Sequence, residues 1–135
     1  GAQFAFPDKL VVSISGDGSI QMNIQELATA VAYRLPVKVI ILNNGCLGMI
    51  RQLQEFFYAG RNAANCLEAS PDFVKLAEAY GAYGYRIERR EELSVALKEA
   101  FAAEGPAFID VRVDPSENVY PMVPAGSALG DMMLA

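Results

Sequence analysis

Four short apolar runs alternate along the chain with longer segments in which apolar residues recur every three to four positions. Short apolar runs bounded by turn residues are typical of strands, whereas the longer repeat marks one face of a helix. Because the two kinds of segment alternate, the pattern predicts an α/β fold with an open, mostly parallel sheet and helices on both faces. The strands are expected at 10–15, 37–42, 83–87 and 108–113, and the helices at 24–35, 47–57, 71–80 and 91–103.

Smaller features refine these elements. The run Leu10–Ser15 is expected to be buried on both of its faces, as strands of parallel sheets usually are. Asn23 opens the sequence NIQE, which is typical of a capping box, and Ser70-Pro71 is typical of an N-cap followed by the first helical residue. In the last strand the polar residues Asp110 and Arg112 alternate with apolar ones, which predicts that one face of this strand is wetter.

Composition and charge narrow the classes of function. The 135 residues, 53% hydrophobic and 20% charged, suit one globular domain, expected at 1–114 and followed by an irregular tail at 115–135. A net charge of −5 argues against binding to nucleic acid. The sequence has no His and only two cysteines, Cys46 and Cys66, so a Cys/His zinc site and a His-dependent nucleophile are excluded within it.

The surroundings of the protein are indicated by what the sequence lacks. It has no run of about 18 apolar residues, so no membrane-spanning helix is expected. Two cysteines form no disulfide framework, which favours a reducing cytoplasm. The sequence opens without an initiator methionine, and we expect a piece of a longer chain whose sheet is incomplete at its N-terminal side.

Two turn sequences follow the first two expected strands and form the candidate site. Gly16-Asp17-Gly18-Ser19 follows the first strand, and Asn43-Asn44-Gly45 follows the second. Ligands of open α/β sheets bind at the carboxyl ends of the strands, where both turns would lie. Asp17 and Asn44 offer the oxygen ligands that Mg²⁺ prefers, and backbone N–H groups near Ser19 suit phosphate oxygens. The arrangement predicts a metal-bridged diphosphate site.

Simpler interpretations of these turns stay open. Asp between glycines and Asn-Asn-Gly are both common turn sequences. The segment is not a Walker loop, because no Gly-Lys-Ser/Thr follows, and Gln21 stands where a dinucleotide fingerprint needs a third small residue. A phosphate-binding module without catalytic activity is therefore an alternative to an enzyme.

The spacing of the two turns matches a known motif. GDGS, followed 24 residues later by NN, resembles the thiamine-diphosphate-binding motif of thiamine-dependent enzymes. The sequences NIQELATA, NNGCLGM and VYPMVP are similar to the C-terminal domain of acetolactate (acetohydroxyacid) synthase catalytic subunits. The resemblance covers nearly the whole chain and implies the thiamine-diphosphate-binding fold.

The resemblance assigns roles to individual residues. It implies that the side chains of Asp17 and Asn44 and the backbone carbonyl of Cys46 bind Mg²⁺. It also implies that Met49 and Leu53 line the substrate channel. The residues that it places against the cofactor are Gly16, Asp17, Gly18, Ser19, Asn44, Leu47, Gly48 and Met49.

The resemblance also implies an activity and partners. Family enzymes use thiamine diphosphate and Mg²⁺ to decarboxylate pyruvate and join the product to a second 2-ketoacid, and they carry FAD that binds mainly outside this domain. The activating glutamate belongs to another domain of a partner subunit, so no catalytic residue is expected here and this chain alone is expected to be inactive. A homodimer or tetramer, a small regulatory subunit and a cytoplasmic or plastid location are implied. The alternative enzyme is another thiamine-dependent decarboxylase, carboligase or oxidase.

Two positions depart from the family pattern. Leu53 stands where most members have a tryptophan that shapes the site for the second substrate and for herbicides. The departure predicts a weaker preference for 2-ketobutyrate and weak binding of sulfonylurea-type inhibitors. Cys46 stands where bulkier side chains are common, which leaves a carbonyl ligand unaffected.

Overall fold

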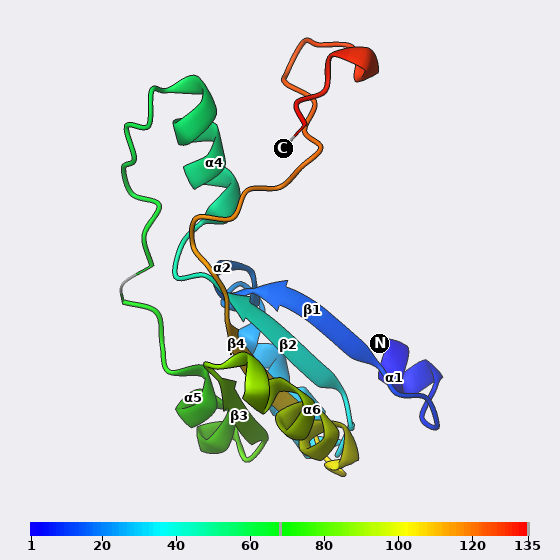
Figure 1. Ribbon diagram of the computed structural model, residues 1–135. Helices are drawn as coiled ribbons and strands as arrows, with labels where there is room; N and C mark the ends of the chain where they lie inside the picture. Colours follow the sequence, from blue (N-terminus) through cyan, green and yellow to red (C-terminus); the bar gives the residue numbers. More distant parts are fainter. Residues whose placement is uncertain (68, 135) are drawn as a thin grey trace.

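A single open sheet of four parallel strands forms the centre of the computed structural model, which describes residues 1–67 and 69–134 (Figure 1). The strand order is β1-β2-β4-β3, and Ile40 of β2 pairs with Ile14 of β1 on one side and Ile109 of β4 on the other. The strands are β1 (Val12–Gly16), β2 (Lys38–Asn43), β3 (Tyr83–Ile87) and β4 (Ala107–Arg112). The predicted open α/β sheet is confirmed, and its described strands are all parallel.

Helices connect the strands in the expected order. The α-helices are α1 (Ala2–Ala5), α2 (Asp17–Ile20), α3 (Leu27–Ala32), α4 (Gly48–Phe57), α5 (Phe73–Tyr80) and α6 (Leu93–Ala102). Among the described residues, 3₁₀ turns lie at Ile24–Glu26, Arg90–Glu92 and Leu129–Asp131. In the part of the chain that the structure describes, no helix is long and apolar enough to cross a membrane.

The handedness of the crossovers explains which helix covers which face. The chain moves in one direction across the sheet from β1 to β2 and on to β3, and in the opposite direction from β3 to β4. Because such crossovers are right-handed, helices of the two directions must lie on opposite faces. α3 and α5 accordingly pack over Val39, Ile41 and Phe108, whereas α6 packs over Ile109 on the other face.

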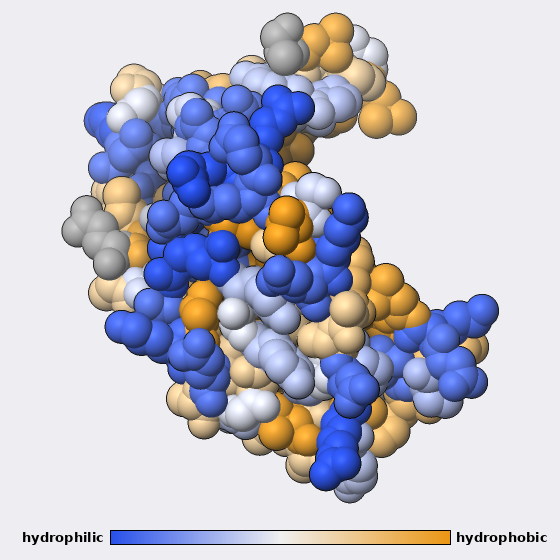
Figure 2. Space-filling view, turned by 60° about the horizontal axis from the view of Figure 1, so that its bottom comes forward, coloured by the Kyte–Doolittle hydropathy of each residue, from blue (hydrophilic) through white to orange (hydrophobic). Residues whose placement is uncertain are grey.

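The first strand differs from its prediction, because it lies at an edge of the sheet. Val12 and Ile14 are 38% and 69% exposed, so the expectation that Leu10–Ser15 is buried on both faces is wrong. Both residues share a face with Ile40, on the side of the sheet where α6 packs mainly over β3 and β4. Apolar side chains are accordingly exposed on the surface of the molecule, as the orange atoms of Figure 2 show.

The caps predicted for two helices are also wrong. The segment after Asn23 begins as a 3₁₀ turn in which the Glu26 N–H donates to the backbone carbonyl of Asn23 (3.1 Å), so a capping box is not formed. The helix expected to start at Ser70-Pro71 starts later, with Asp72 as N-cap. Its carboxylate accepts from the N–H groups of Val74 and Lys75 (both 3.1 Å). Asp72 and not Ser70 caps this helix, because the carboxylate of Asp72 reaches two N–H groups of the first turn.

The burial of Asp110 also differs from the prediction. The alternation in β4 predicts a wetter face, but Asp110 is only 1% exposed because α5 and the neighbouring strands cover it. The side chain of Arg112, two residues on, is 47% exposed. A carboxylate in such a position needs polar partners within the fold.

Candidate functional site

The two turns singled out in the sequence lie side by side at the carboxyl ends of β1 and β2. These strands are neighbours, and Gly16 at the end of β1 pairs with Leu42 of β2. Asp17 follows directly as the first residue of α2, which is a single helical turn where a loop was expected. Asn44 follows β2 and precedes α4. A strand–helix–strand unit therefore brings together two residues that are far apart in the sequence.

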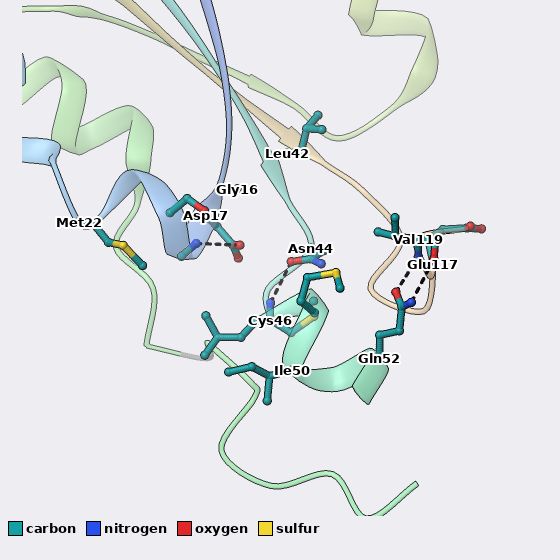
Figure 3. Close-up of a pocket in the computed structure, with 15 residues that line it drawn as sticks. Gly16, Asp17, Met22, Leu42, Asn44, Cys46, Ile50, Gln52, Glu117 and Val119 are labelled. Carbon is teal, nitrogen blue, oxygen red and sulfur yellow. Dashed lines mark hydrogen bonds between the residues drawn. The ribbon is translucent and has the colours of Figure 1, made fainter. Parts of the chain in front are cut away.

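A cavity of about 380 Å³ opens between these two turns (Figure 3). In Figure 3 the carboxylate of Asp17 and the amide of Asn44 face the same space. Every residue expected to contact the cofactor or the metal lines this cavity, namely Gly16, Asp17, Gly18, Ser19, Asn44, Cys46, Leu47, Gly48 and Met49. Their assignment to a particular ligand stays a prediction.

Asp17 carries the strongest sign of a missing partner. It is 2% exposed, and its Oδ1 accepts from the Gly18 N–H (3.0 Å). Its other oxygen, Oδ2, is buried and has no hydrogen-bond partner among the described residues. Burial raises the pKa of Asp17, and the Gly18 N–H opposes this only in part. A buried carboxylate oxygen without a partner is costly, and a bound cation would satisfy it.

The remaining donors around Asp17 suit a hard cation. Asn44 Oδ1 accepts from the Cys46 N–H (3.2 Å) and keeps a second lone pair for another partner. Within the described ranges, no group of three or more His, Cys, Asp and Glu side chains could hold a metal. A cation here would therefore draw on amide, carbonyl, water and phosphate oxygens, which is the set that Mg²⁺ prefers.

Glycines keep the cavity open for a diphosphate. A Cβ on Gly18 would lie 2.8 Å from the Leu47 side chain, and one on Gly48 would lie 3.0 Å from Asn44 Nδ2. Gly48 is also the first residue of α4, a helix of 10 residues whose N-terminal N–H groups lack helical partners. Helix N-termini favour anions, so this end of the cavity suits phosphate oxygens.

Cys46 is buried and is held to a distant segment. The backbone of Cys46 forms an isolated antiparallel β-bridge with the backbone of Cys66. Two hydrogen bonds flank it, from the Leu47 N–H to the Asn65 carbonyl (2.7 Å) and from the Leu67 N–H to the Gly45 carbonyl (2.8 Å). Burial raises the pKa of the Cys46 thiol, so the neutral form is favoured. This supports its expected contribution through the backbone and not through sulfur.

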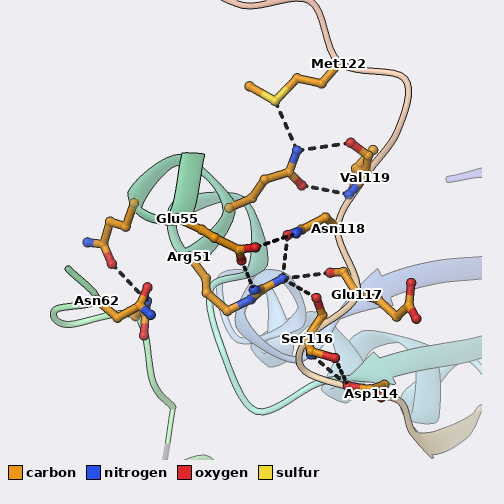
Figure 4. A network of polar contacts seen from close by, with 12 residues as sticks. Arg51, Glu55, Asn62, Asp114, Ser116, Glu117, Asn118, Val119 and Met122 are labelled. Carbon is orange, nitrogen blue, oxygen red and sulfur yellow. Dashed lines mark hydrogen bonds and ion pairs between the residues drawn. The ribbon is translucent and has the colours of Figure 1, made fainter. Parts of the chain in front are cut away.

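Sequence reasoning missed part of the cavity wall. The missed residues are Met22, Leu42, Ile50, Gln52, Glu117 and Val119. Glu117 and Val119 come from the tail, which α4 holds through polar contacts (Figure 4). Gln52 is 1% exposed and pairs with the backbone of Val119 through both amide atoms (2.7 and 3.0 Å). Arg51 donates to the carbonyls of Ser116 and Glu117 (3.1 and 2.8 Å).

The two expected substrate-channel residues line different hollows. Met49 lines the cavity beside Asp17, whereas Leu53, one turn later on α4, does not. Leu53 lines a neighbouring hollow of about 490 Å³ with Phe57, Tyr58, Met122, Val123, Pro124 and Ala125. Both side chains are partly exposed on the same side of α4, which allows them to flank one path toward the cavity.

Comparisons with known proteins agree with this geometry. The chain is 48% identical over 136 residues to the acetolactate synthase large subunit of Haemophilus influenzae and 48% identical over 138 residues to the isozyme 3 large subunit of Escherichia coli strain K12. It is 43% identical over 134 residues to the acetolactate synthase large subunit of the red alga Porphyra purpurea. These alignments cover 98–100% of the chain but only 23–24% of the relatives, so the chain spans about a quarter of their length.

A solved structure and a family profile give the same result. The thiamine diphosphate-dependent 4-hydroxybenzoylformate decarboxylase of Rhodococcus jostii RHA1 superposes with a TM-score of 0.77 and 39% identity, over 84% of this chain and 21% of that one. Residues 1–111 match the family described as "Thiamine pyrophosphate enzyme, C-terminal TPP binding domain", thiamine pyrophosphate being another name for thiamine diphosphate. This chain therefore belongs to the family of C-terminal thiamine-diphosphate-binding domains of thiamine-dependent enzymes.

Proposed function

We propose that this chain is the cofactor-binding part of an acetolactate synthase large subunit and that it holds the Mg²⁺–diphosphate end of thiamine diphosphate. The observation that carries the proposal is the buried Asp17 carboxylate, whose Oδ2 lacks a partner and faces a cavity shared with Asn44. The tail favours acetolactate synthase over other thiamine-dependent enzymes. The family profile ends at residue 111, but the alignments with acetolactate synthases run through the tail that supplies Glu117 and Val119.

The roles of the residues follow from their positions. Asp17 and Asn44 would hold Mg²⁺ through side-chain oxygens, and Cys46 would add its backbone carbonyl. The N–H groups near Gly18 and at the start of α4 would receive diphosphate oxygens. Thiamine diphosphate, when bound, supplies the electron sink for decarboxylation and carbon–carbon bond formation at 2-ketoacids. Apolar wall residues such as Leu42 and Ile50 would exclude water from the cavity.

The complete protein has further features under this proposal. Its substrates are pyruvate and a second 2-ketoacid, and its FAD binds mainly outside this chain. It forms a homodimer or tetramer, with a small regulatory subunit as partner, in the cytoplasm or a plastid. The relatives from bacteria and red algae are named acetolactate synthase large subunits, which supports this assignment.

The activity is tested by incubating the natural protein that carries this chain with pyruvate, Mg²⁺ and thiamine diphosphate. We expect acetolactate as the product, and no product from the 135-residue chain alone. Acetaldehyde and CO₂ without acetolactate would favour a simple decarboxylase. The likeness to the Rhodococcus decarboxylase makes that the second candidate. Acetolactate formed by the isolated chain would contradict the expected need for a glutamate from another domain.

Leu53 gives a prediction on substrate preference. The Leu53→Trp variant is expected to raise the preference for 2-ketobutyrate over pyruvate as acceptor by roughly tenfold, the scale of one changed pocket contact. Sulfonylurea-type inhibitors should bind it more tightly for the same reason. Competition between the two acceptors measures the ratio. Val95→Trp, at an exposed position of α6, is the matched control, and an unchanged ratio in Leu53→Trp would remove Leu53 from the substrate path.

A further inference from the structure

Asp110 lies in the middle of β4 and is almost completely buried. Its Oδ1 accepts a hydrogen bond from Asn43 Nδ2 at 2.8 Å. Its Oδ2 faces two cations, Arg86 Nε at 3.5 Å and an Arg112 guanidinium nitrogen at 4.0 Å. The two oxygens therefore serve different neighbours: one an amide, the other a pair of charged side chains.

The amide that Asp110 binds is the residue before the proposed metal ligand Asn44. Asn43 ends β2 and is 2% exposed. Its Oδ1 accepts from the Gly45 N–H (3.2 Å), and its backbone carbonyl accepts from the Val113 N–H (3.1 Å). Asn43 thus closes the turn around Asn44, with Asp110 on one end of its amide and Gly45 on the other.

The chemistry of the pair fixes the direction of this amide. The backbone N–H of Gly45 can only donate, so Asn43 must turn its oxygen toward Gly45, and its NH₂ group then points to the carboxylate oxygen of Asp110. Without an acceptor at position 110, the Asn43 NH₂ group would be buried without a partner and the amide could leave the turn. The backbone that presents Asn44 and the Cys46 carbonyl would then lose a fixed conformation.

We propose that Asp110 is a positioning residue for the metal loop: through Asn43 it holds the turn that presents Asn44 and Cys46 to the metal. The inference rests on the proposed function, because it needs a metal at this loop. A merely structural role would run through the other oxygen, where Arg86 links Asp110 to Asp72 at the start of α5. The two roles can be separated because they use different atoms of the same carboxylate.

The experiment uses Mn²⁺ as the probe, in the natural protein that carries this chain. Free Mn²⁺ is measured by electron paramagnetic resonance in the presence of thiamine diphosphate, and the unfolding midpoint is measured without metal. Asp110→Leu removes the acceptor, and Asp110→Asn keeps one. Arg86→Gln removes the ion pairs of Arg86 with Asp110 Oδ2 and with Asp72, and leaves the hydrogen bond on Asp110 Oδ1 in place. Asn43→Ala removes the amide itself.

We expect the Mn²⁺ dissociation constant to rise about 10- to 100-fold in Asp110→Leu and Asn43→Ala, the usual cost of losing an outer-shell partner. It should stay within about threefold of wild type in Asp110→Asn, which keeps an acceptor for Asn43 Nδ2. Arg86→Gln should lower the unfolding midpoint and leave Mn²⁺ affinity unchanged. This pattern assigns the effect to the hydrogen bond and not to the charge network.

Other results overturn the proposal. Wild-type affinity in a folded Asp110→Leu variant, or an equal loss in Arg86→Gln, would reduce Asp110 to a structural ion pair. Should Asp110→Leu fail to fold, wild-type affinity in Asn43→Ala overturns the proposal by itself. A wild-type protein that binds no Mn²⁺ would contradict the proposed function, and this inference with it. Binding by wild type with no loss in the variants contradicts this inference alone.

Discussion

Replacing Asp17 by alanine is expected to abolish the magnesium-dependent binding of thiamine diphosphate to the natural protein that carries this chain. Asp17 is the buried carboxylate of the cavity, and its Oδ2 has no hydrogen-bond partner among the described residues. Losing a direct ligand should reduce affinity by more than the roughly 10- to 100-fold cost of an outer-shell partner. Calorimetric titration of thiamine diphosphate, with Mg²⁺ and with a chelator, measures the effect.

Substitution of Asp17 is expected to affect the stability of the metal-free protein in the direction opposite to its effect on cofactor binding. Burial without a cation disfavours the charged form of Asp17, as its raised pKa indicates. The metal-free Asp17→Asn variant should therefore be at least as stable as the metal-free wild type, although it binds the cofactor poorly. Asp8→Ala, at an exposed position outside the site, should change neither property. Equal cofactor binding by Asp17→Ala and wild type would remove Asp17 from the site.

The position of the site follows from local patterns that the sequence contains. Asp17 and Asn44 each follow an apolar run, and one helix of suitable length lies between the runs. A strand–helix–strand unit with a right-handed crossover places the carboxyl ends of both strands at one edge of the sheet. Identifying the strands was therefore enough to predict that these two residues meet.

The rest of the cavity depends on contacts between distant segments. Gln52 looks like a solvated residue of an amphipathic helix, but it is 1% exposed because the tail covers it at Val119, 67 residues away. Ile14 is exposed because its strand lies at an edge of the sheet. Asp72 becomes the N-cap of α5 because of the direction in which the chain enters that helix. Strand and helix periodicity carries no information on any of these contacts. The alternating pattern around Asp110 would be the same whether that face of the strand were exposed to solvent or covered by a helix.

Gly84 is the position where a single methyl group should have the largest effect on stability. It lies in β3, and a Cβ built on it would meet α5 at the Val74 carbonyl oxygen (2.8 Å), Cγ1 (2.9 Å) and Cα (3.0 Å). Two of these atoms are backbone, so rotating a side chain cannot make room. The close approach of β3 and α5 therefore requires glycine, for a reason that the apolar pattern of the strand does not reveal.

We expect Gly84→Ala to lower the free energy of unfolding by about 2–3 kcal/mol, the upper part of the range for inserting a methyl group into a packed interior. The sign is informative, because Gly→Ala in an open strand position normally stabilises by reducing the entropy of the unfolded chain. Gly130→Ala is the matched control, since a Cβ there meets nothing within 4 Å and should leave stability nearly unchanged. Urea unfolding of both variants measures the difference.

A measurement of thiamine diphosphate binding by Gly84→Ala distinguishes an effect on the packing of β3 against α5 from an effect on the candidate site. Gly84 lies on the edge strand farthest from β1, and neither Gly84 nor Val74 lines the cavity. The folded fraction of Gly84→Ala should therefore bind thiamine diphosphate with wild-type affinity below its unfolding transition. Unchanged stability would mean that α5 can shift away from β3 at little cost. Weakened binding in a fully folded variant would mean that the β3–α5 contact is coupled to the turns at Asp17 and Asn44 through β4 and β2, the strands between them.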